Sequence, residues 1–167
     1  DLLHASFGRE SEIALLERSV LGRFPARAMI YGAFGVGRTH TLVGLAARTE
    51  IQARFGGRIA YISLRGAPSG DMEISALSGI VDTDHLRDKP ALLLIDDLDE
   101  PWRSERVQAA SQLDQLATML PAATIVATTR GSREAVERFP DAIALGPLAE
   151  AAAIDMMTEL APGIGQF

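Results

Sequence analysis

The sequence predicts a single α/β domain built on a parallel sheet with helices on both of its faces. Short apolar runs alternate with helical patterns along nearly the whole chain, which is typical of strands separated by helices. The runs are apolar at almost every position rather than at every second one, which indicates strands buried on both faces. The first run leads into a glycine-rich turn and then a helix. Together these observations favour a parallel sheet with crossover helices.

The first half of the chain is expected to hold two strands and two helices. Apolar residues at helical spacing predict an amphipathic helix over residues 10–21. Residues 27–31 form the first strand, and the glycine-rich turn leads into a second helix. That helix is expected to end near the Gly56-Gly57 pair, because glycine punctuates helix ends. Residues 58–64 then form the second strand.

The second half of the chain repeats the alternation after a less regular stretch. Residues 66–90 suggest one or two short helices. The three further strands are expected at residues 91–95, 123–127 and 142–145. The helices between and after them are expected at residues 107–120, closed by Pro121, and at residues 148–160.

Composition and charge exclude several classes of protein. Hydrophobic residues make up 47% and charged residues 23% of the 167 residues, an ordinary globular balance. The net charge of −6 argues against a domain that grips nucleic-acid phosphates, so we expect no direct nucleic-acid contact. The chain has no cysteine and no apolar run near the roughly 20 residues that span a bilayer, and its first residues lack the basic start and the cleavage site expected of a signal peptide. We therefore expect a cytoplasmic protein without membrane contact, and the two ends of the sequence suggest a fragment of a longer chain.

The glycine-rich turn at residues 32–39 reads Gly-Ala-Phe-Gly-Val-Gly-Arg-Thr. It follows the phosphate-loop pattern G-x-x-x-x-G-K-[ST] at all but one position, between an apolar strand and a helix. Gly32, Gly35 and Gly37 let the backbone turn its N–H groups inward around a phosphate. The N-terminus of the following helix adds positive charge at the same place. The alternative is a glycine-rich turn that binds no nucleotide.

The residues that close this loop are expected to meet the nucleotide and its metal ion. The hydroxyl group of Thr39 would bind Mg²⁺, and the backbone amide of His40 would face the α-phosphate. Arg38 stands where the pattern has lysine, and a planar guanidinium group is not interchangeable with a compact ammonium group. Either hydrolysis was discarded while binding was kept, or a chain with fifteen arginines and one lysine has drifted here.

Acidic residues follow the apolar strand at residues 92–95. In phosphate-loop enzymes an acid at this place holds Mg²⁺, and a second acid can orient or deprotonate the attacking water. We assign Asp96 to the metal ion and Asp97 to the water. Asp99 and Glu100 are expected to be solvated loop residues. The alternative is that the whole run is solvated.

The order of these elements resembles the NB-ARC-like group of signal-transducing NTPases with numerous domains. This group includes plant disease-resistance proteins, an apoptotic protease-activating scaffold and many bacterial transcription regulators. The elements that carry the resemblance are Phe7-Gly8-Arg9-Glu10, Gly35-Val36-Gly37, residues 61–66, residues 92–97, Thr128-Thr129-Arg130 and Leu145-Gly146-Pro147-Leu148. The set covers residues 7–148 in the family's order, although Arg38 departs from the family's lysine.

The resemblance implies both a fold and a nucleotide site. The fold would be a P-loop NTPase three-layer α/β/α sandwich with a five-stranded parallel sheet of strand order 5-1-4-3-2. Phe7, Arg9 and Pro147 would border adenine, and Val36 would lie in the phosphate loop. Arg130 would act as a sensor of the γ-phosphate.

The function implied is a switch controlled by ATP and ADP within a larger signalling or transcription-regulating protein. Residues 1–148 would be the nucleotide-binding domain, and residues 149–167 the truncated start of a helical lid. Its partners would be the adenine nucleotide with Mg²⁺, further domains of the same chain and other copies of the chain when ATP is bound. Hydrolysis is expected to be slow or absent because of Arg38. Two alternatives stay open: a degenerate scaffold that mediates protein contacts without nucleotide, and a turnover ATPase.

Overall fold

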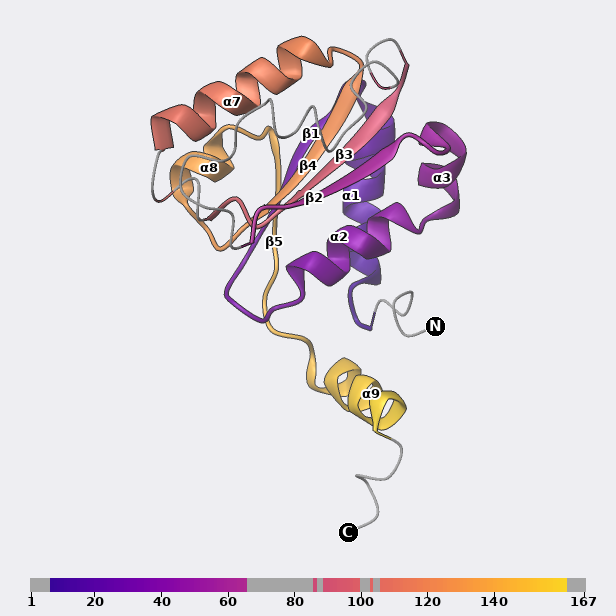
Figure 1. The fold of residues 1–167 in the computed structure, drawn as a ribbon. Coiled ribbons are helices and arrows are strands. Elements are labelled where there is room, and N and C mark those ends of the chain that lie inside the picture. Colours follow the sequence, from indigo (N-terminus) through magenta and orange to yellow (C-terminus); the bar gives the residue numbers. More distant parts are fainter. Residues whose placement is uncertain (1–6, 66–85, 87–88, 100–102, 104–105, 162–167) are drawn as a thin grey trace.

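The computed structural model describes residues 7–65, 86, 89–99, 103 and 106–161 (Figure 1). Its centre is a five-stranded parallel sheet with the strand order β2-β3-β4-β1-β5. The strands are β1 (Arg27–Tyr31), β2 (Ile59–Ser63), β3 (Ala91–Asp96), β4 (Ala123–Thr129) and β5 (Asp141–Ala144). The strand order 5-1-4-3-2 is therefore confirmed, with β1 between β4 and β5.

Helices cover both faces of the sheet, which confirms the three-layer sandwich. The helices are α1 (Glu10–Gly22), α2 (Arg38–Ala46), α3 (Thr49–Phe55), α7 (Arg106–Met119), α8 (Arg133–Glu137) and α9 (Glu150–Leu160). Figure 1 shows α1, α2 and α3 on one side of the sheet and α7 and α8 on the other. The helix α9 lies outside these layers, below the sheet in the same view.

The two-residue period of the strands explains how one sheet supports two cores. In β3, Leu92 and Leu94 pack on the side of α1, α2 and α3, whereas Leu93 and Ile95 pack on the side of α7. Every residue of β3 and β4 is buried, which accounts for their uninterrupted apolar sequence. The C-terminal ends of these central strands therefore emerge together at one edge of a rigid sheet.

Two parts of the helix prediction differ from the structure. The second helix is divided, because Arg48 adopts an extended conformation (φ −65°, ψ 138°) between α2 and α3. The side chain of Gln52 donates a hydrogen bond to the carbonyl oxygen of Ala46 and so satisfies a carbonyl group at the end of α2. The five-residue helix α8 was not expected at all. The helices expected in residues 66–90 lie almost wholly outside the described residues.

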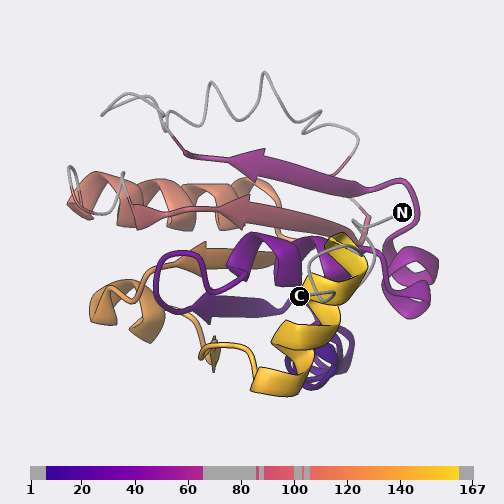
Figure 2. The ribbon, with the colours of Figure 1, turned by 90° about the horizontal axis from the view of Figure 1, so that it is seen from below.

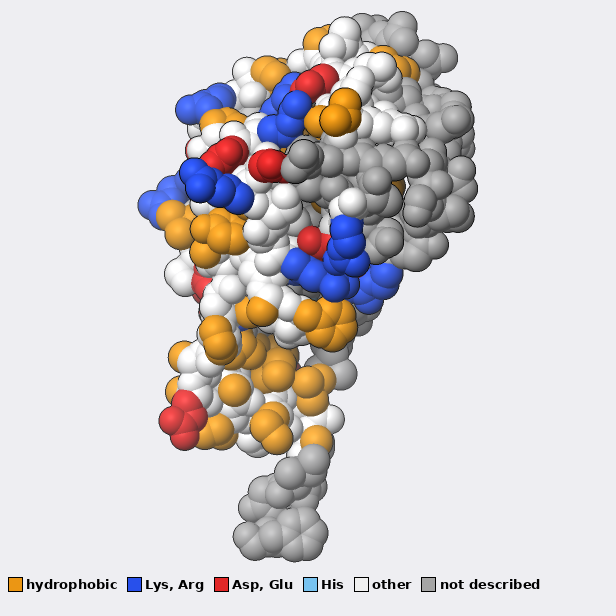
Figure 3. All heavy atoms as spheres, turned by 90° about the vertical axis from the view of Figure 1, so that its left-hand side faces the viewer, with side chains coloured by type: hydrophobic (Ala, Val, Ile, Leu, Met, Phe, Trp, Pro, Cys, Tyr) orange, Lys and Arg blue, Asp and Glu red, His pale blue; other side chains and the backbone are white. Residues whose placement is uncertain are grey.

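The helix α9 contributes no buried residue to the core. Its side chains Ile154, Met157 and Leu160 are each more than half exposed. Figure 3 shows the hydrophobic side chains gathered on the lower lobe where α9 lies. Across the described residues, no helix is both long enough and apolar enough to cross a membrane.

Candidate functional site

The glycine-rich loop connects β1 to α2 at the C-terminal edge of the sheet. Gly35 and Gly37 have φ angles of 77° and 98°, a backbone conformation that L side chains rarely adopt. Gly32 is constrained differently, because a Cβ atom there would lie 2.5 Å from the carbonyl oxygen of Leu145. The loop therefore needs glycine at each of the three positions. Gly37 also directly precedes the first turn of α2.

The carboxylate group of Asp96 accepts three hydroxyl groups from three different elements. Thr39 donates to Oδ2 at 2.8 Å from the start of α2, and Tyr61 donates to the same oxygen at 3.0 Å from β2. Thr128 donates to Oδ1 at 2.6 Å from β4. Asp96 is only 3% exposed. Thr39 and Asp96, the two residues expected to hold Mg²⁺, thus lie in direct contact.

The oxygen donors at this place suit a hard cation. Mg²⁺ prefers oxygen ligands and is commonly held by one or two protein groups together with water and phosphate oxygens. A hydroxyl and a carboxylate at hydrogen-bond distance provide that donor set. Tyr61 was not expected at the site, because it belongs to the edge strand β2 and the sequence gives no sign of where its hydroxyl group lies. Burial raises the pKa of Tyr61, and the carboxylate of Asp96 raises it further.

Asp97 has an uncommon backbone conformation next to this contact. Its φ is 65°, which a non-glycine residue adopts rarely and at a cost of order 1–3 kcal/mol. Its Oδ2 lies 3.6 Å from Nε of Arg65, and its buried Oδ1 has no hydrogen-bond partner among the described residues. Burial raises the pKa of the Asp97 carboxyl group, and the neighbouring Asp99 raises it further. A buried carboxyl oxygen without a partner suits a group that meets water or ligand.

The expectation that Asp99 is a solvated loop residue is wrong. Its side chain is 9% exposed, and its Oδ2 lies 3.3 Å from Nη1 of Arg38, whose side chain is 8% exposed. Its carboxylate also accepts the hydroxyl group of Thr129 at 2.9 Å and the backbone N–H of Arg130 at 2.8 and 3.0 Å. Burial by itself would raise the pKa of Asp99. A hydrogen bond with Asp97, the hydrogen bonds from Arg130 and Thr129, and the charge of Arg38 together lower it. Glu100 lies outside the described residues.

Arg130 reaches from the end of β4 toward the phosphate loop. Its Nε lies 3.7 Å from Oδ2 of Asp99, and its Cζ lies 5.4 Å from the ring centroid of Phe34. Phe34 itself is 76% exposed at the tip of the loop. The residue proposed as a phosphate sensor therefore lies beside both the loop and the acidic strand end.

Arg9 links the phosphate loop to the segment that leads into α9. Its Nη2 donates to the carbonyl oxygens of Val36 at 2.8 Å and Gly146 at 2.6 Å. Its Nη1 forms an ion pair with Glu12 at 2.9 Å, and the residue is 4% exposed. The guanidinium group thus fixes two backbone segments that are far apart in the sequence. This role was not anticipated, since Arg9 was expected to border adenine.

A mainly apolar cavity of about 640 Å³ lies between this loop and α9, on the same edge of the sheet. Its volume is within the usual range for small-molecule sites. Seven of the residues expected to bind nucleotide line it: Phe7, Arg9, Gly35, Val36, Gly37, His40 and Pro147. Ala153, Met156 and Leu160 of α9 provide the opposite wall, and none of these residues was singled out from the sequence. Figure 2, seen from below, shows α9 on the viewer's side of the sheet.

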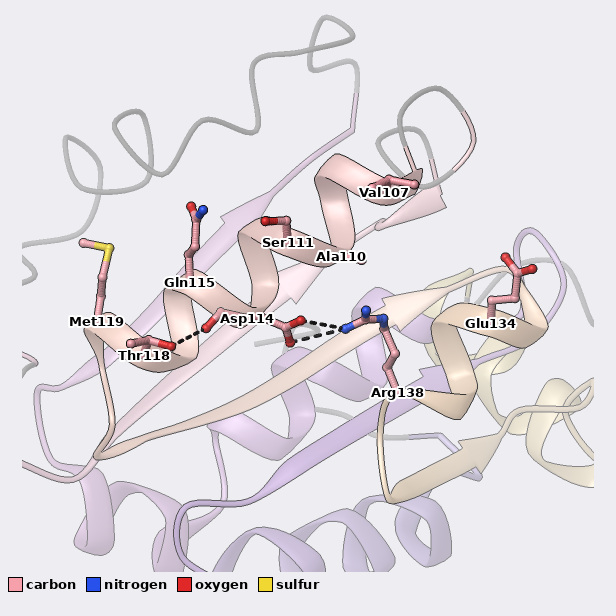
Figure 4. Close-up of a pocket in the computed structure, with 9 residues that line it drawn as sticks. All are labelled: Val107, Ala110, Ser111, Asp114, Gln115, Thr118, Met119, Glu134 and Arg138. Atoms are coloured by element: carbon pink, nitrogen blue, oxygen red, sulfur yellow. Dashed lines mark hydrogen bonds and ion pairs between the residues drawn. The ribbon is translucent and has the colours of Figure 1, made fainter.

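A second and larger hollow of about 820 Å³ lies between α7 and α8, far from the phosphate loop (Figure 4). It is lined by seven residues of α7 together with Glu134 of α8 and Arg138, which directly follows α8. The positive charge of Arg138 is engaged by Asp114 at 3.1 Å. None of the residues singled out from the sequence lies in it. Its size alone gives no reason to prefer it to the smaller cavity, which the glycine loop lines.

The fold is similar to that of several solved replication proteins. The Aeropyrum pernix Orc1 protein in complex with DNA has a TM-score of 0.70 at 16% identity, with 96% of this chain and 51% of that chain covered. Domain III of the Thermotoga maritima replication initiation protein DnaA has a TM-score of 0.63 at 22% identity, covering 96% and 72%. AMPPCP-bound DnaA from Aquifex aeolicus has a TM-score of 0.60 at 19% identity, covering 95% and 52%.

These neighbours are P-loop ATPase domains of the AAA+ type, and the likeness at such low identity shows a shared fold. This chain spans about half the length of most of these structures' chains. No family model matches the chain, and no curated protein matches it either. The P-loop NTPase fold is therefore shown, and the NB-ARC-like resemblance stays a prediction.

Proposed function

We propose that this chain is the adenine-nucleotide-binding part of an ATP- and ADP-controlled switch of the NB-ARC-like type, within a larger signalling or transcription-regulating protein. One observation carries the proposal. The glycine loop, the contact between Thr39 and Asp96, and the apolar cavity beside Pro147 all lie at one C-terminal edge of the sheet. Ligands of open α/β sheets bind at this edge, with phosphates at the N-terminus of the following helix.

The shape of the site suggests how the nucleotide would lie. Backbone N–H groups of residues 35–40 would hold the phosphates, and the adenine ring would enter the cavity between Phe7 and Met156. Arg9 would support both parts, because it fixes the carbonyl groups of Val36 and Gly146 on either side of the cavity. Mg²⁺, when bound, would supply positive charge to the phosphates, with Thr39 and Asp96 as its protein ligands.

Binding without brisk hydrolysis fits the surroundings of Arg38. Its guanidinium group is buried against Asp99, whereas rapid phosphoryl transfer needs a cation held in line with the β- and γ-phosphates. A switch needs tight binding and only slow turnover, so the site suits a switch better than a turnover ATPase. The Aquifex aeolicus neighbour was solved with AMPPCP, an ATP analogue, which supports an adenine nucleotide as the ligand. The net charge of −6 still argues against direct nucleic-acid contact.

The test is a thermal-shift and calorimetric titration with ADP, MgATP and GDP. A ligand that binds only the folded state stabilises that state, by about 2.7 kcal/mol at a ligand concentration of 100 times Kd. This stabilisation raises the melting temperature. We expect ADP and MgATP to raise the melting temperature and GDP to raise it less.

Two neighbouring residues of α9 provide a matched pair of variants. Met156 lines the cavity, while Met157 does not line it and is 54% exposed. Met156→Glu places a carboxylate group in the cavity and should weaken ADP binding at least about tenfold, which is about 1.4 kcal/mol. Met157→Glu adds the same charge to the same helix and should leave ADP binding within about twofold. Equal effects of the two variants would contradict the position given to the base.

A degenerate scaffold is the second candidate, and the buried pair of Arg38 and Asp99 is the observation that favours it. If the loop no longer binds a phosphate, the positive charge of Arg38 is expected to be neutralised by another group of the protein. In that case neither ADP nor MgATP at millimolar concentration shifts the melting temperature. The protein purified from its own cells would also carry no nucleotide.

A further inference from the structure

We propose that Asp99 is a specificity-determining residue that competes with the phosphates of the nucleotide for Arg38, and so weakens binding of the triphosphate most. This inference rests on the proposed function. It concerns the ion pair between Nη1 of Arg38 and Oδ2 of Asp99, 3.3 Å apart. Arg38 belongs to the phosphate loop, but its charge is already engaged by another anion.

The geometry indicates which of the two partners moves. The carboxylate of Asp99 is fixed by the backbone N–H of Arg130 and by the hydroxyl group of Thr129. Thr129 is the last residue of β4, a strand buried at every position, and Arg130 directly follows it. Arg38, by contrast, has a long side chain with several rotatable bonds. A bound phosphate would therefore draw Arg38 away while Asp99 stays in place.

The charges explain why this exchange is feasible and why it has a cost. Both side chains are more than nine-tenths buried, where charges interact more strongly than in water. Leaving a buried carboxylate without a cation is unfavourable. Arg130 reduces that cost, because its Nε lies 3.7 Å from the same Oδ2 and would remain there after Arg38 leaves. The remaining cost falls on any ligand that needs Arg38, and a γ-phosphate needs it more than the shorter ADP does.

The experiment is a double-mutant cycle on the full chain with Asp99→Asn and Arg38→Met. Asparagine keeps an oxygen for Thr129 and for the N–H of Arg130, but can replace Oδ2 by an amide group that repels a guanidinium group. Methionine retains much of the length of arginine and has no charge. Binding of MgATP and of ADP to the four proteins is measured by calorimetry.

We expect Asp99→Asn to tighten MgATP binding about tenfold when Arg38 is present, which is about 1.4 kcal/mol, and to tighten ADP binding less. In the Arg38→Met background the same change should alter MgATP binding by less than about twofold. Equal tightening in both backgrounds would mean that Asp99 acts only through its own negative charge. That result, or no tightening in either background, overturns the inference while the proposed function stands.

Two outcomes separate this inference from the proposed function. If neither the wild type nor any variant binds nucleotide, the proposed function fails and the inference with it. If only the Asp99→Asn variant binds, competition for Arg38 is supported directly.

Urea unfolding of the same four proteins without nucleotide keeps the test valid if one variant is unstable. If Arg38 and Asp99 are paired, each single change should lower the urea concentration at the unfolding midpoint, and the double variant should regain part of the loss. If Asp99→Asn does not fold but the double variant does, the pairing is supported. If the double variant also fails to fold while Arg38→Met folds, Asp99 acts independently of Arg38 and the inference is overturned.

Discussion

The carboxylate of Asp96 joins α2, β2 and β4 through the hydroxyl groups of Thr39, Tyr61 and Thr128. An ionised carboxylate has about four lone-pair sites, so these three hydroxyl donors leave one site for a metal ion. The effect of this negative charge on the pKa of Tyr61 should be measurable without any ligand. It provides a test of the site that does not depend on nucleotide.

Asp96→Asn should lower the pKa of Tyr61. Burial raises this pKa, and the charge of Asp96 and its hydrogen bond raise it further, since a second negative charge beside the carboxylate is disfavoured. Removing the charge leaves burial, which raises this pKa, opposed by the hydrogen bond with Ser63 and the charge of Arg65, which lower it. Because the chain has two tyrosines, Tyr31→Phe serves as the background in which absorbance of the phenolate reports Tyr61 alone. An unchanged titration midpoint would mean that the two groups are not in contact.

Arg38→Lys should raise the rate of ATP hydrolysis from a very low level. The wide guanidinium group can bind the phosphates and still place the γ-phosphate poorly, whereas a compact ammonium group can place it better, and a misplacement of about 1 Å can cost on the order of 100-fold in rate. Phosphate release is measured for the wild type, for Arg38→Lys and for Arg38→Lys combined with Asp97→Asn, which should abolish the gain.

Two other results of this experiment would be informative. If the lysine variant binds ATP but stays inert, the site has lost more than one residue and serves only for binding. Brisk turnover by the wild type would contradict the preference for a switch over an enzyme.

Single residues differ in how far the sequence determines their environment. The glycines and Thr39 follow a pattern whose geometry is local, so their placement in the loop between β1 and α2 could be predicted. Asp99 could not be placed in this way, because its partner Arg38 is 61 positions away and the pairing depends on how α2 meets the end of β3. An acid in an acidic run gives the same sequence signal whether it is solvated or buried. The contact of Tyr61 was hidden for the same reason.

At the scale of elements, Arg9 connects the start of α1 to two loops. Its hydrogen bonds to the carbonyl oxygens of Val36 and Gly146 are charge-assisted and almost completely buried. Such bonds contribute about 1.5–3 kcal/mol each. Arg9 therefore ties the start of α1 to the phosphate loop and to the segment before α9, in addition to the buried apolar face of α1.

Arg9→Ala should destabilise the protein by about 2–4 kcal/mol and lower the melting temperature by roughly 5–10 °C. The matched control is Arg133→Ala on α8, where an arginine also pairs with a glutamate but is 89% exposed. That change should shift the melting temperature by no more than about 1–2 °C. Both variants are compared by differential scanning calorimetry without ligand. Equal shifts would show that the buried hydrogen bonds of Arg9 contribute little.

The strands were easier to predict than the helices, for a physical reason. Strands buried on both faces need uninterrupted apolar sequence, so β1, β3 and β4 are apparent from composition alone. The break between α2 and α3 lies at Arg48, whose extended conformation is not what its good helix propensity predicts. The helix α8 has only five residues, too few to show a periodic pattern.

On the scale of the whole molecule, α9 is the element least integrated into the fold. It provides one wall of the cavity, yet none of its residues is buried, and several large apolar side chains remain exposed. The sheet with its two helical layers holds both hydrophobic cores. Stability and base recognition are therefore expected to depend on different parts of the chain, and the boundary after residue 148 stays a prediction.

A chain that ends at residue 148 should keep its fold but lose much of its affinity for ADP. Stability should change little, with the melting temperature within about 2–3 °C of the full chain, because the removed helix buries no side chain in either core. Binding should fall about tenfold, since Ala153, Met156 and Leu160 no longer cover the base, and covering one apolar side chain is worth about 1.5–3 kcal/mol. Calorimetric unfolding and ADP titration of the two chains measure both effects.

Loss of cooperative unfolding would show that α9 belongs to the folding unit and that the boundary is wrong. Undiminished ADP binding would place the base outside the cavity.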